Sequence, residues 1–180
     1  MIIEGGAIDN LTEFKDGLFF VQNEAAQLVG FIANPKANDN VLDCCAAPGG
    51  KTTHISELTL DKAKVLALDI NESRLELIRD NAKRLGIENI SVKQADSMNL
   101  SKTLDDDLFD IVLCDVPCSG LGLMSRKPDI RQTISYERIE ELLPKQKQIL
   151  QNSSKYLKKG GRLIFSTCTM NKKENEIDIE

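Results

Sequence analysis

The sequence lacks any long apolar run. A membrane-spanning helix needs about 20 predominantly apolar residues, and no stretch of that length is free of charges here. The N-terminal residues also lack a basic segment followed by an apolar block, so they do not indicate a secretory signal. With 41% hydrophobic and 28% charged residues, the 180-residue chain has the composition of a soluble globular protein. We therefore expect a single cytoplasmic domain without a membrane partner.

The ligands of a structural metal site are missing as well. His54 is the only histidine, and no second pair of cysteines or histidines joins Cys114 and Cys118 to complete a tetrahedral zinc set. The five cysteines are an odd number, and without a secretory signal reduced thiols are the default. We expect free thiols and no metal.

There is no excess of positive charge. The chain carries 23 Lys and Arg against 28 Asp and Glu, a net charge of -5, whereas proteins that bind nucleic acids usually present a basic face. The overall charge therefore does not favour a nucleic acid as the partner, although a local basic patch could still bind one.

Two nucleotide-binding motifs are incomplete or absent. The stretch CAAPGGKTTH, residues 45–54, contains the Gly-Lys-Thr that ends a phosphate-binding P-loop. That motif requires glycine where this chain has Cys45, and Pro48 removes a backbone N–H from the phosphate cradle. The dinucleotide fingerprint G-x-G-x-x-G is absent too. A nucleotide hydrolase is therefore disfavoured.

What the sequence does contain is an alternation of apolar strands and helical patterns. It predicts strands at residues 41–45, 64–69, 90–92, 109–114 and 162–166, and helices at residues 52–60, 71–85 and 136–157. Asn71 and Gly86 are the expected caps of the second helix, and Pro144 predicts a kink or a division of the third. Residues 1–20 are expected to form an extended lead-in or an edge hairpin. Uninterrupted apolar strands between helices favour an α/β fold with a mainly parallel sheet covered on both faces.

Acidic or thiol side chains follow the end of every predicted strand. They occur at residues 43–51, Asp69, Asp96, residues 115–118 and residues 167–168. Because ligands of open parallel sheets bind beyond the carboxyl ends of the strands, these positions predict one site.

The glycine turn and Asp69 predict a nucleoside-containing cofactor. Gly49 and Gly50 allow the backbone to approach a ligand closely, and the Asp69 carboxylate is placed to accept hydrogen bonds from two ribose hydroxyls. S-adenosylmethionine fits this layout, because it carries no pyrophosphate. Asp69 could equally cap the helix that begins near Asn71, so the residues alone leave both interpretations open.

Five segments together resemble a known family. They read VLDCCAAPGGKTTH, LALDINESRLELIRDNAKRLG, DIVLCDVPCSGLG, RKPDIR and GGRLIFSTCT. In this order they are similar to the motifs of the ribosomal RNA cytosine-5 methyltransferases of the Sun (RsmB) type, from about Phe19 to Glu180. DVPCSG together with STCT is the most specific part. The resemblance implies a class I, Rossmann-like methyltransferase fold with S-adenosylmethionine as the methyl donor.

The resemblance also implies roles for single residues. Asp69 would bind the ribose, Asp96 would lie beside the adenine, and Asp115 would be the acid at the end of the fourth strand. Cys168 would be the catalytic nucleophile, and Cys118 the second cysteine, which helps to release the product. The cofactor loop would consist of Cys45, Ala46, Ala47, Pro48, Gly49, Gly50 and Lys51, and Asp115 would belong to both the cofactor site and the catalytic site.

Two cysteines suit this reaction, because carbon 5 of cytosine is too weak a nucleophile to take a methyl group unaided. A thiolate added to carbon 6 makes carbon 5 enamine-like, and the carbon 5 proton and the thiolate must leave afterwards. Asp115 is a candidate to hydrogen-bond the base at N3 or its amino group. DNA cytosine-5 methyltransferases instead attack with a Pro-Cys thiol after the fourth strand, which would make Cys118 the nucleophile. Cys168 has no counterpart in the DNA enzymes, so its presence favours RNA over DNA as the substrate. Cys44 and Cys114 lie inside apolar strands and are expected only to pack.

A basic segment follows Cys118. Arg126, Lys127 and Arg131 surround a single acid, and such a patch can hold phosphates while a base enters the site. A solvated loop without a binding role is the alternative.

The resemblance finally implies missing parts, since the family usually carries an N-terminal helical RNA-binding domain and continues past the position of Glu180. We expect residues 1–34 to be a lead-in and residues 35–180 a catalytic domain lacking its C-terminal strands. The implied substrate is 16S ribosomal RNA. Transfer RNA methylation, methylation of a small molecule and a non-catalytic cofactor-binding module remain alternatives.

Overall fold

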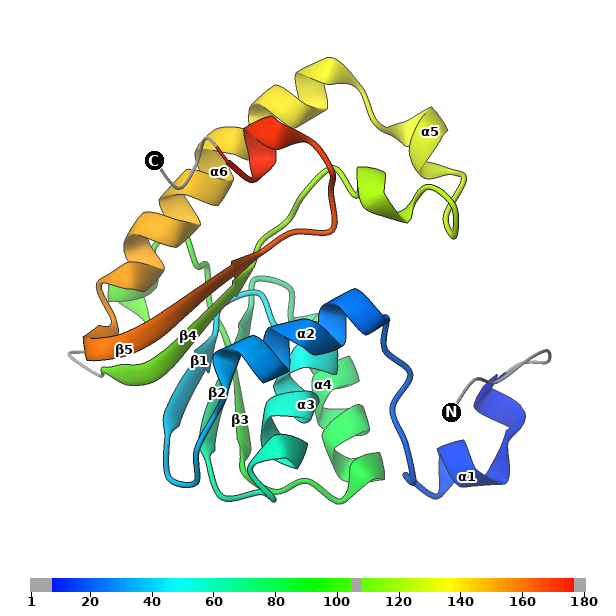
Figure 1. The fold of residues 1–180 in the computed structure, drawn as a ribbon, viewed down its shortest axis with the longest axis vertical. Helices are drawn as coiled ribbons and strands as arrows, with labels where there is room; N and C mark the ends of the chain where they lie inside the picture. Colours follow the sequence, from blue (N-terminus) through cyan, green and yellow to red (C-terminus); the bar gives the residue numbers. More distant parts are fainter. Residues whose placement is uncertain (1–7, 105–107, 177–180) are drawn as a thin grey trace.

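A parallel five-stranded sheet forms the centre of the molecule (Figure 1). The computed structural model describes residues 8–104 and 108–176. The strands run in the order β3-β2-β1-β4-β5, and each neighbouring pair is parallel. Their bounds are Asn40–Asp43 (β1), Lys64–Asp69 (β2), Ile90–Gln94 (β3), Phe109–Asp115 (β4) and Leu157–Ser166 (β5). The predicted α/β fold is confirmed.

Helices cover both faces of this sheet. In Figure 1, α2, α3 and α4 lie on one side of the strands and α6 lies on the other. The longer helices are Glu24–Ala33 (α2), Gly50–Leu58 (α3), Glu72–Leu85 (α4) and Tyr136–Ser154 (α6). Short helical segments are Ile8–Asn10 (η1), Thr12–Lys15 (α1), Leu100–Lys102 (η2), Leu121–Leu123 (η3), Ile130–Thr133 (α5) and Lys172–Glu174 (η4). Within residues 8–104 and 108–176, no helix is both long enough and apolar enough to cross a bilayer.

The central strands are apolar on both faces because both faces are buried. In β4, Val112 and Cys114 pack in one cluster with Ile149 of α6, while Ile111 and Leu113 pack with residues of α2 and α3 in a second. Successive side chains of a strand point to opposite faces, so a strand covered on both sides is apolar throughout.

The caps predicted for α4 are confirmed. The Asn71 side chain accepts a hydrogen bond from the Ser73 N–H at 3.0 Å, and Gly86 ends the helix with φ 69°. The division of α6 at Pro144 is wrong, because one helix runs through that residue.

The fifth strand begins at Leu157 rather than at residue 162. Gly160 and Gly161 suggest a loop, yet the strand continues through them. Leu157 pairs with Phe109, and the register shifts between Phe109 and Ile111, so that the extra residues of β5 fit opposite β4.

The lead-in forms short helices at Ile8–Asn10 and Thr12–Lys15 and no strand up to residue 20, so the edge hairpin is wrong for residues 8–20; residues 1–7 lie outside the described ones. Arg84 of α4 fixes this segment, since its Nη1 donates to the carbonyl oxygens of Phe14 and Phe19 at 2.7 and 3.1 Å. α2 follows, with Asn23 as its N-cap and Val29, Gly30 and Ala33 buried.

Candidate active site

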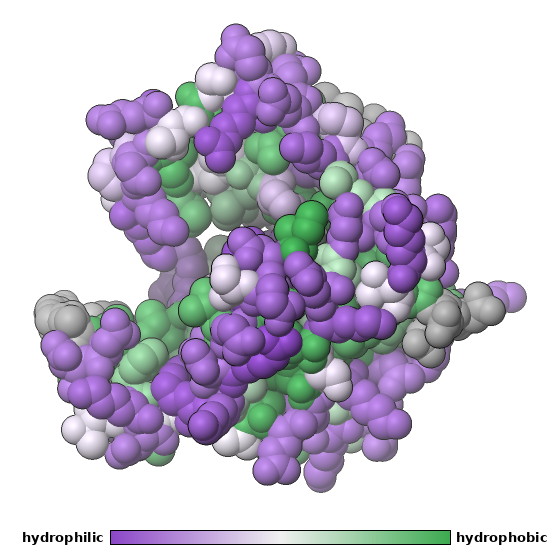
Figure 2. Space-filling view, turned by 180° about the vertical axis from the view of Figure 1, so that it is seen from behind, coloured by the Kyte–Doolittle hydropathy of each residue, from purple (hydrophilic) through white to green (hydrophobic). Residues whose placement is uncertain are grey.

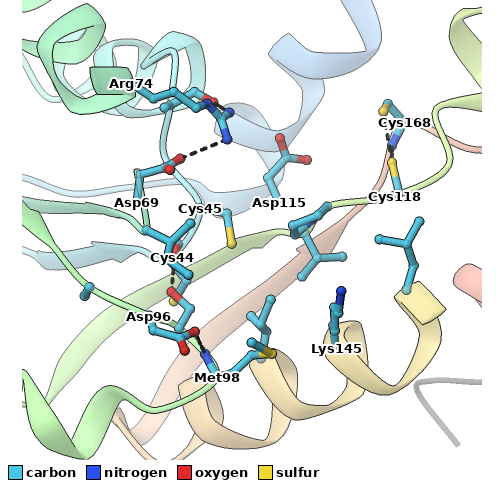
Figure 3. A pocket seen from close by; sticks show the side chains of 18 residues that line it. Cys44, Cys45, Asp69, Arg74, Asp96, Met98, Asp115, Cys118, Lys145 and Cys168 are labelled. Atoms are coloured by element: carbon cyan, nitrogen blue, oxygen red, sulfur yellow. Dashed lines mark hydrogen bonds and ion pairs between the residues drawn. The ribbon is translucent and has the colours of Figure 1, made fainter. Parts of the chain in front are cut away.

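A cavity of about 450 Å³ lies at the carboxyl ends of the strands (Figure 3). Its walls come from the segments that follow β1, β2, β3 and β4, from one side of α6, and from Cys168 after β5. All strands are parallel, so their carboxyl ends share one edge of the sheet, as the sequence predicts for this site.

The glycine turn joins β1 to α3 beneath this cavity. Gly49 has φ +104°, a left-handed conformation that favours glycine, and an added Cβ would lie 3.4 Å from Ile78. The Arg74 Nη2 donates to the Ala47 carbonyl at 2.8 Å and holds the turn against α4. Among the predicted loop residues, Cys45 and Ala47 line the cavity.

Asp69 also lines the cavity, close to the glycine turn, with only 4% of its surface exposed. One carboxylate oxygen accepts from the Asn71 N–H at 3.0 Å, and the other lies 3.4 Å from Arg74 Nη1. A carboxylate has about four acceptor positions, so Asp69 keeps acceptor capacity after making these contacts. The N-cap of α4 is Asn71, so Asp69 supports the turn before the helix and also lines the cavity, and ribose binding stays a prediction.

Asp96 also lines the cavity, and its Oδ1 accepts a hydrogen bond from the Met98 N–H at 2.9 Å. The next residue, Ser97, is buried and donates from Oγ to the Cys44 carbonyl at 2.5 Å. This contact ties the segment after β3 to the turn after β1.

Asp43 is a buried acid under the glycine turn. Its Oδ2 accepts from the Thr52 hydroxyl at 2.7 Å, while its Oδ1 has no hydrogen-bond partner among the described residues. Burial raises the pKa of Asp43 to about 6, against the opposing effects of Thr52 and Lys51.

The two predicted catalytic cysteines meet beside the cavity (Figure 3). The Sγ atoms of Cys118 and Cys168 are 3.0 Å apart, although the residues come from different strand ends. Cys118 is half-buried and Cys168 is exposed. A thiol that is reachable from solvent and paired with a donor can act as a nucleophile.

The environment favours Cys168 as the ionised partner. A hydrogen bond from the Cys118 thiol lowers the pKa of Cys168 to about 7, despite the opposing effect of burial. The same pairing, together with burial, raises the pKa of Cys118 well above its usual range. The backbone N–H of Cys168 also donates to Cys118 Sγ at 3.2 Å. This hydrogen bond lowers the pKa of Cys118, but by less than the Cys168 thiol and burial raise it.

Asp115 stands between the glycine turn and the end of β5. Its Oδ2 accepts from Lys51 Nζ at 2.5 Å, and its Oδ1 accepts from the Ser166 hydroxyl at 2.7 Å. The side chain remains 32% exposed and lines the cavity. The predicted loop residue Lys51 thus contributes through Asp115, whereas Ala46, Pro48, Gly49 and Gly50 do not line the cavity.

The other cysteines are not arranged for attack. Cys44 and Cys114 are buried in the core, as the sequence predicts. Burial raises the pKa of the Cys45 thiol above its usual range, so this side chain stays neutral at the cavity wall. Among the described residues, no three His, Cys, Asp or Glu side chains are grouped to hold a metal ion.

The comparison with protein families decides the identity of this fold and site. Residues 31–180 match the family described as 16S rRNA methyltransferase RsmB/F.

The chain belongs to the RsmB/F family.

Two curated relatives of this RsmB/F chain are named "Probable ribosomal RNA small subunit methyltransferase B". The protein from Bacillus subtilis (strain 168) is 39% identical over 171 residues, which cover 95% of this chain and 38% of the relative. The protein from Synechocystis sp. is 42% identical over 175 residues, which cover 97% and 39%. The chain thus spans about two fifths of the length of these relatives.

A solved structure shares the fold of this RsmB/F chain. The crystal structure of NSun6 from Pyrococcus horikoshii with SFG is 33% identical, with a TM-score of 0.89, and the match covers 97% of this chain and 44% of that chain. The class I methyltransferase fold expected from the resemblance is confirmed.

The sequence of this RsmB/F chain does not mark three residues of the site. Arg74 donates to the carbonyl of Ala47 in the glycine turn and pairs with Asp69. Lys145 of α6 lines the cavity (Figure 3), and Glu174 accepts hydrogen bonds from Ser119, next to Cys118. No motif marks these residues. The helical pattern of α6 could have placed Lys145 near the sheet, but not at the cavity.

The basic segment lies beyond Cys118, with Arg126 and Lys127 between η3 and α5 and Arg131 in α5. Arg126, Lys127 and Arg131 are exposed, and none of them takes part in the ion pairs found among the described residues. The structure leaves these three cations accessible to an anionic ligand.

Proposed function

We propose that this chain is the catalytic domain of an enzyme that transfers a methyl group from S-adenosylmethionine to carbon 5 of a cytosine in small-subunit ribosomal RNA. The observation that carries the proposal is the pair of cysteine sulfurs 3.0 Å apart beside the strand-end cavity. A cavity for a methyl donor alone would need neither thiol.

The cavity suits S-adenosylmethionine. Its volume of about 450 Å³ lies within the usual range for cofactor sites. The free acceptor capacity of Asp69 matches two ribose hydroxyls, and Ala47 of the glycine turn lines the cavity with only a methyl side chain. The relative that was solved with SFG, an S-adenosylmethionine analogue, supports this assignment. When bound, the donor supplies an electrophilic methyl carbon.

In the proposed reaction, the Cys168 thiolate forms a bond to carbon 6 of cytosine and the carbon 5–carbon 6 double bond opens. Carbon 5 then accepts the methyl group. Loss of the carbon 5 proton to a base re-forms the double bond as the carbon–sulfur bond breaks and Cys168 leaves as thiolate. Cys118 donates a hydrogen bond to the departing sulfur and stabilises it, which gives the second cysteine its role in release.

Asp115 is proposed to bind the base. Its carboxylate is fixed by Lys51 and Ser166 and keeps an exposed part at the cavity. An acceptor held in this way can take a hydrogen bond from the cytosine amino group without reorganising during the reaction.

The names of the curated relatives support ribosomal RNA as the substrate. A base inside a folded RNA must leave its stack to reach the cysteines. The basic residues Arg126, Lys127 and Arg131 are proposed to hold the neighbouring phosphates. The boundary near residue 34 and a cytoplasmic location stay predictions.

Covalent trapping tests the assignment of the two cysteines. Cys118→Ala and Cys168→Ala variants of the protein are incubated with substrate RNA and S-adenosylmethionine, and denaturing gels are examined for a protein–RNA complex. We expect a stable complex with Cys118→Ala, because the bond to carbon 6 forms and release is impaired. Cys168→Ala should give none.

Each alternative has its own outcome in this experiment. A complex with Cys168→Ala alone would reverse the roles of the cysteines. Methylation that survives both substitutions would indicate a substrate that needs no thiol, such as a small molecule. Wild-type protein that fails to bind the donor would indicate a non-catalytic module. Bisulfite sequencing of total RNA from cells with and without the gene then identifies the cytosine, and a signal in transfer RNA would redirect the substrate assignment.

The role of the basic patch is tested with Arg126→Glu. We expect weaker RNA binding at moderate salt, because one phosphate contact becomes repulsive. Affinity for S-adenosylmethionine should stay unchanged, since Arg126 does not line the cavity. Lys64→Glu, at the amino end of β2 and away from the cavity, is the matched control. RNA affinities that are equal in the two variants would remove the patch from the proposal.

A further inference from the structure

A buried carboxylate lies behind the two cysteines, on the side away from the cofactor cavity. Glu174 belongs to η4, the short helical segment after β5, and its side chain is fully buried. Figure 1 shows this segment, coloured red, lying against α6. A buried carboxylate is stable only when several hydrogen bonds replace the water it has lost.

Glu174 bonds to both cysteine-bearing loops. Oε1 accepts from the Ser119 N–H at 2.8 Å, and Oε2 accepts from the Ser119 hydroxyl at 2.6 Å. Oε2 also lies 3.3 Å from the Thr169 hydroxyl, which is itself 2.8 Å from the Ser119 hydroxyl. Ser119 follows Cys118 directly, and Thr169 follows Cys168 directly. One side chain therefore connects the immediate neighbours of the two reactive sulfurs.

The carboxylate is itself held in place by α6 and by its own segment. Gln146 of α6 is fully buried, and its Nε2 donates to Glu174 Oε1 at 3.1 Å and to the Pro117 carbonyl at 2.8 Å. Asn171 donates to Glu174 Oε2 at 3.2 Å. Although burial alone would raise it, the pKa of Glu174 is lowered, because these hydrogen bonds favour the ionised form.

Other direct contacts join the two segments mainly at the strand ends, where the Val116 N–H donates to the Ser166 carbonyl at 3.1 Å and the Ser166 hydroxyl to Asp115 Oδ1 at 2.7 Å. Nearer the cysteines, besides the sulfur contacts and the pair of hydroxyls, the Gly122 N–H donates to the Cys168 carbonyl at 3.0 Å. Without Glu174, the Ser119 N–H would lose its partner, and the loops that carry the two cysteines could shift relative to each other although the strand ends stay paired. Displacing a reacting group by about 1 Å can reduce a rate roughly 100-fold.

We propose that Glu174 is the positioning residue that sets the distance and orientation between Cys118 and Cys168. This inference rests on the proposed function, since it gives those thiols their catalytic use. Glu174 touches neither the base nor the donor; it acts through Ser119 and Thr169.

The test compares three variants with the wild-type protein. Glu174→Ala removes the carboxylate. Glu174→Gln keeps its shape and most of its contacts, and Ser119→Ala removes one hydroxyl link between the loops. Glu140→Gln is the matched control, because it breaks the 2.7 Å ion pair between α6 and Lys173 of the same segment without touching either loop.

The first readout is the pH profile of Cys168 alkylation by iodoacetamide, followed by peptide mass spectrometry. The wild-type midpoint should lie near pH 7, because the hydrogen bond from Cys118 and the charge of Lys51 lower the pKa of Cys168 against the raising effects of burial and Asp115. Glu174→Ala should move the midpoint upward, because Cys118 no longer reaches the thiolate. The midpoint for Glu174→Gln should lie between those of the wild type and Glu174→Ala, and the midpoint for Glu140→Gln should equal that of the wild type.

The second readout separates positioning from folding. We expect Glu174→Ala to bind S-adenosylmethionine as the wild type does, while single-turnover methyl transfer to RNA falls roughly 100-fold. If Glu174→Ala fails to fold, Glu174→Gln and Ser119→Ala should each shift the midpoint and lower the rate in smaller steps.

The outcomes distinguish this proposal from the proposed function. An unchanged alkylation midpoint in every folded variant of Glu174 and Ser119 overturns the positioning role, whatever the activity. A wild-type protein that methylates no RNA, but whose midpoint still depends on Glu174, overturns the function and leaves the positioning of the thiols intact. Losses that Glu140→Gln reproduces would assign Glu174 a structural role only.

Discussion

Gly122 lies against Cys168 so closely that it has no room for a side chain. Its N–H donates to the Cys168 carbonyl, and a Cβ on Gly122 would stand 2.9 Å from that carbonyl oxygen. No real Cβ tolerates such a contact, so the backbone at Cys168 would have to move. Glycine is therefore required here by a close approach to the reactive residue rather than by its own conformation.

Gly122→Ala should slow methyl transfer without affecting the cofactor. We expect a loss of roughly 10- to 100-fold in single-turnover rate, because the substitution displaces the nucleophile from its partner. Affinity for S-adenosylmethionine, measured by calorimetry, should not change, since Gly122 does not line the cavity. A variant with the wild-type rate would show that the loop around Cys168 adapts freely.

At the residue scale, the sequence predicts side chains that belong to recognisable motifs and misses those that support them. Cys118 and Cys168 are identified because each lies in a specific motif after a strand. Glu174 and Gln146 act through partners far away in the chain, and nothing in the local pattern marks an acid or amide as buried rather than solvated. Such contacts require the fold.

At the element scale, periodicity predicts the strands well because burial on both faces leaves a strong apolar signal. It fails where tertiary contacts decide. The start of β5 depends on pairing with β4, and the lead-in forms the short helices η1 and α1 where α4 offers it a binding surface. Arg84 is the main part of that surface, with its guanidinium 3.9 Å from the Phe14 ring in addition to its hydrogen bonds.

Arg84→Ala should release the lead-in while the sheet stays folded. The substitution removes two hydrogen bonds and a cation–π contact, so backbone amides in residues 8–20 should exchange with solvent faster by hydrogen–deuterium exchange. Amides of β1 and β4 should keep their protection. Lys83→Ala, on the same turn of α4, is the control. Equal exchange of the lead-in in the two variants would show that other contacts hold it.

At the scale of the whole molecule, the net charge of -5 does not oppose the proposed RNA partner, because charge acts locally. Most of the surface in Figure 2 is hydrophilic, interrupted by a hollow with apolar side chains in its depth. The acids are not evenly solvated, since Asp43 and Asp69 are buried near the cofactor cavity. Buried acids make the stability of the entire fold depend on pH.

Asp43 provides a test at this scale. Its pKa is raised by burial from 3.8 to about 6, so the protonated form is the one that the folded state favours. The resulting stabilisation is complete below pH 3.8 and is lost as the pH rises through about 6. Over that interval the wild type should lose about 3 kcal/mol of unfolding free energy from this group, at 1.36 kcal/mol per pKa unit.

Asp43→Asn cannot ionise, and its side-chain oxygen can still accept the hydrogen bond from Thr52. The free energy of unfolding of each protein is measured by urea titration without cofactor. The difference between Asp43→Asn and the wild type should therefore increase by about 3 kcal/mol from pH 4 to pH 7, in favour of the variant. Asp80→Asn, an exposed site on α4, controls for the loss of one surface charge. Parallel stability curves for wild type and Asp43→Asn would mean that Asp43 stays ionised throughout this range, held so by Lys51 and Thr52 more strongly than burial opposes.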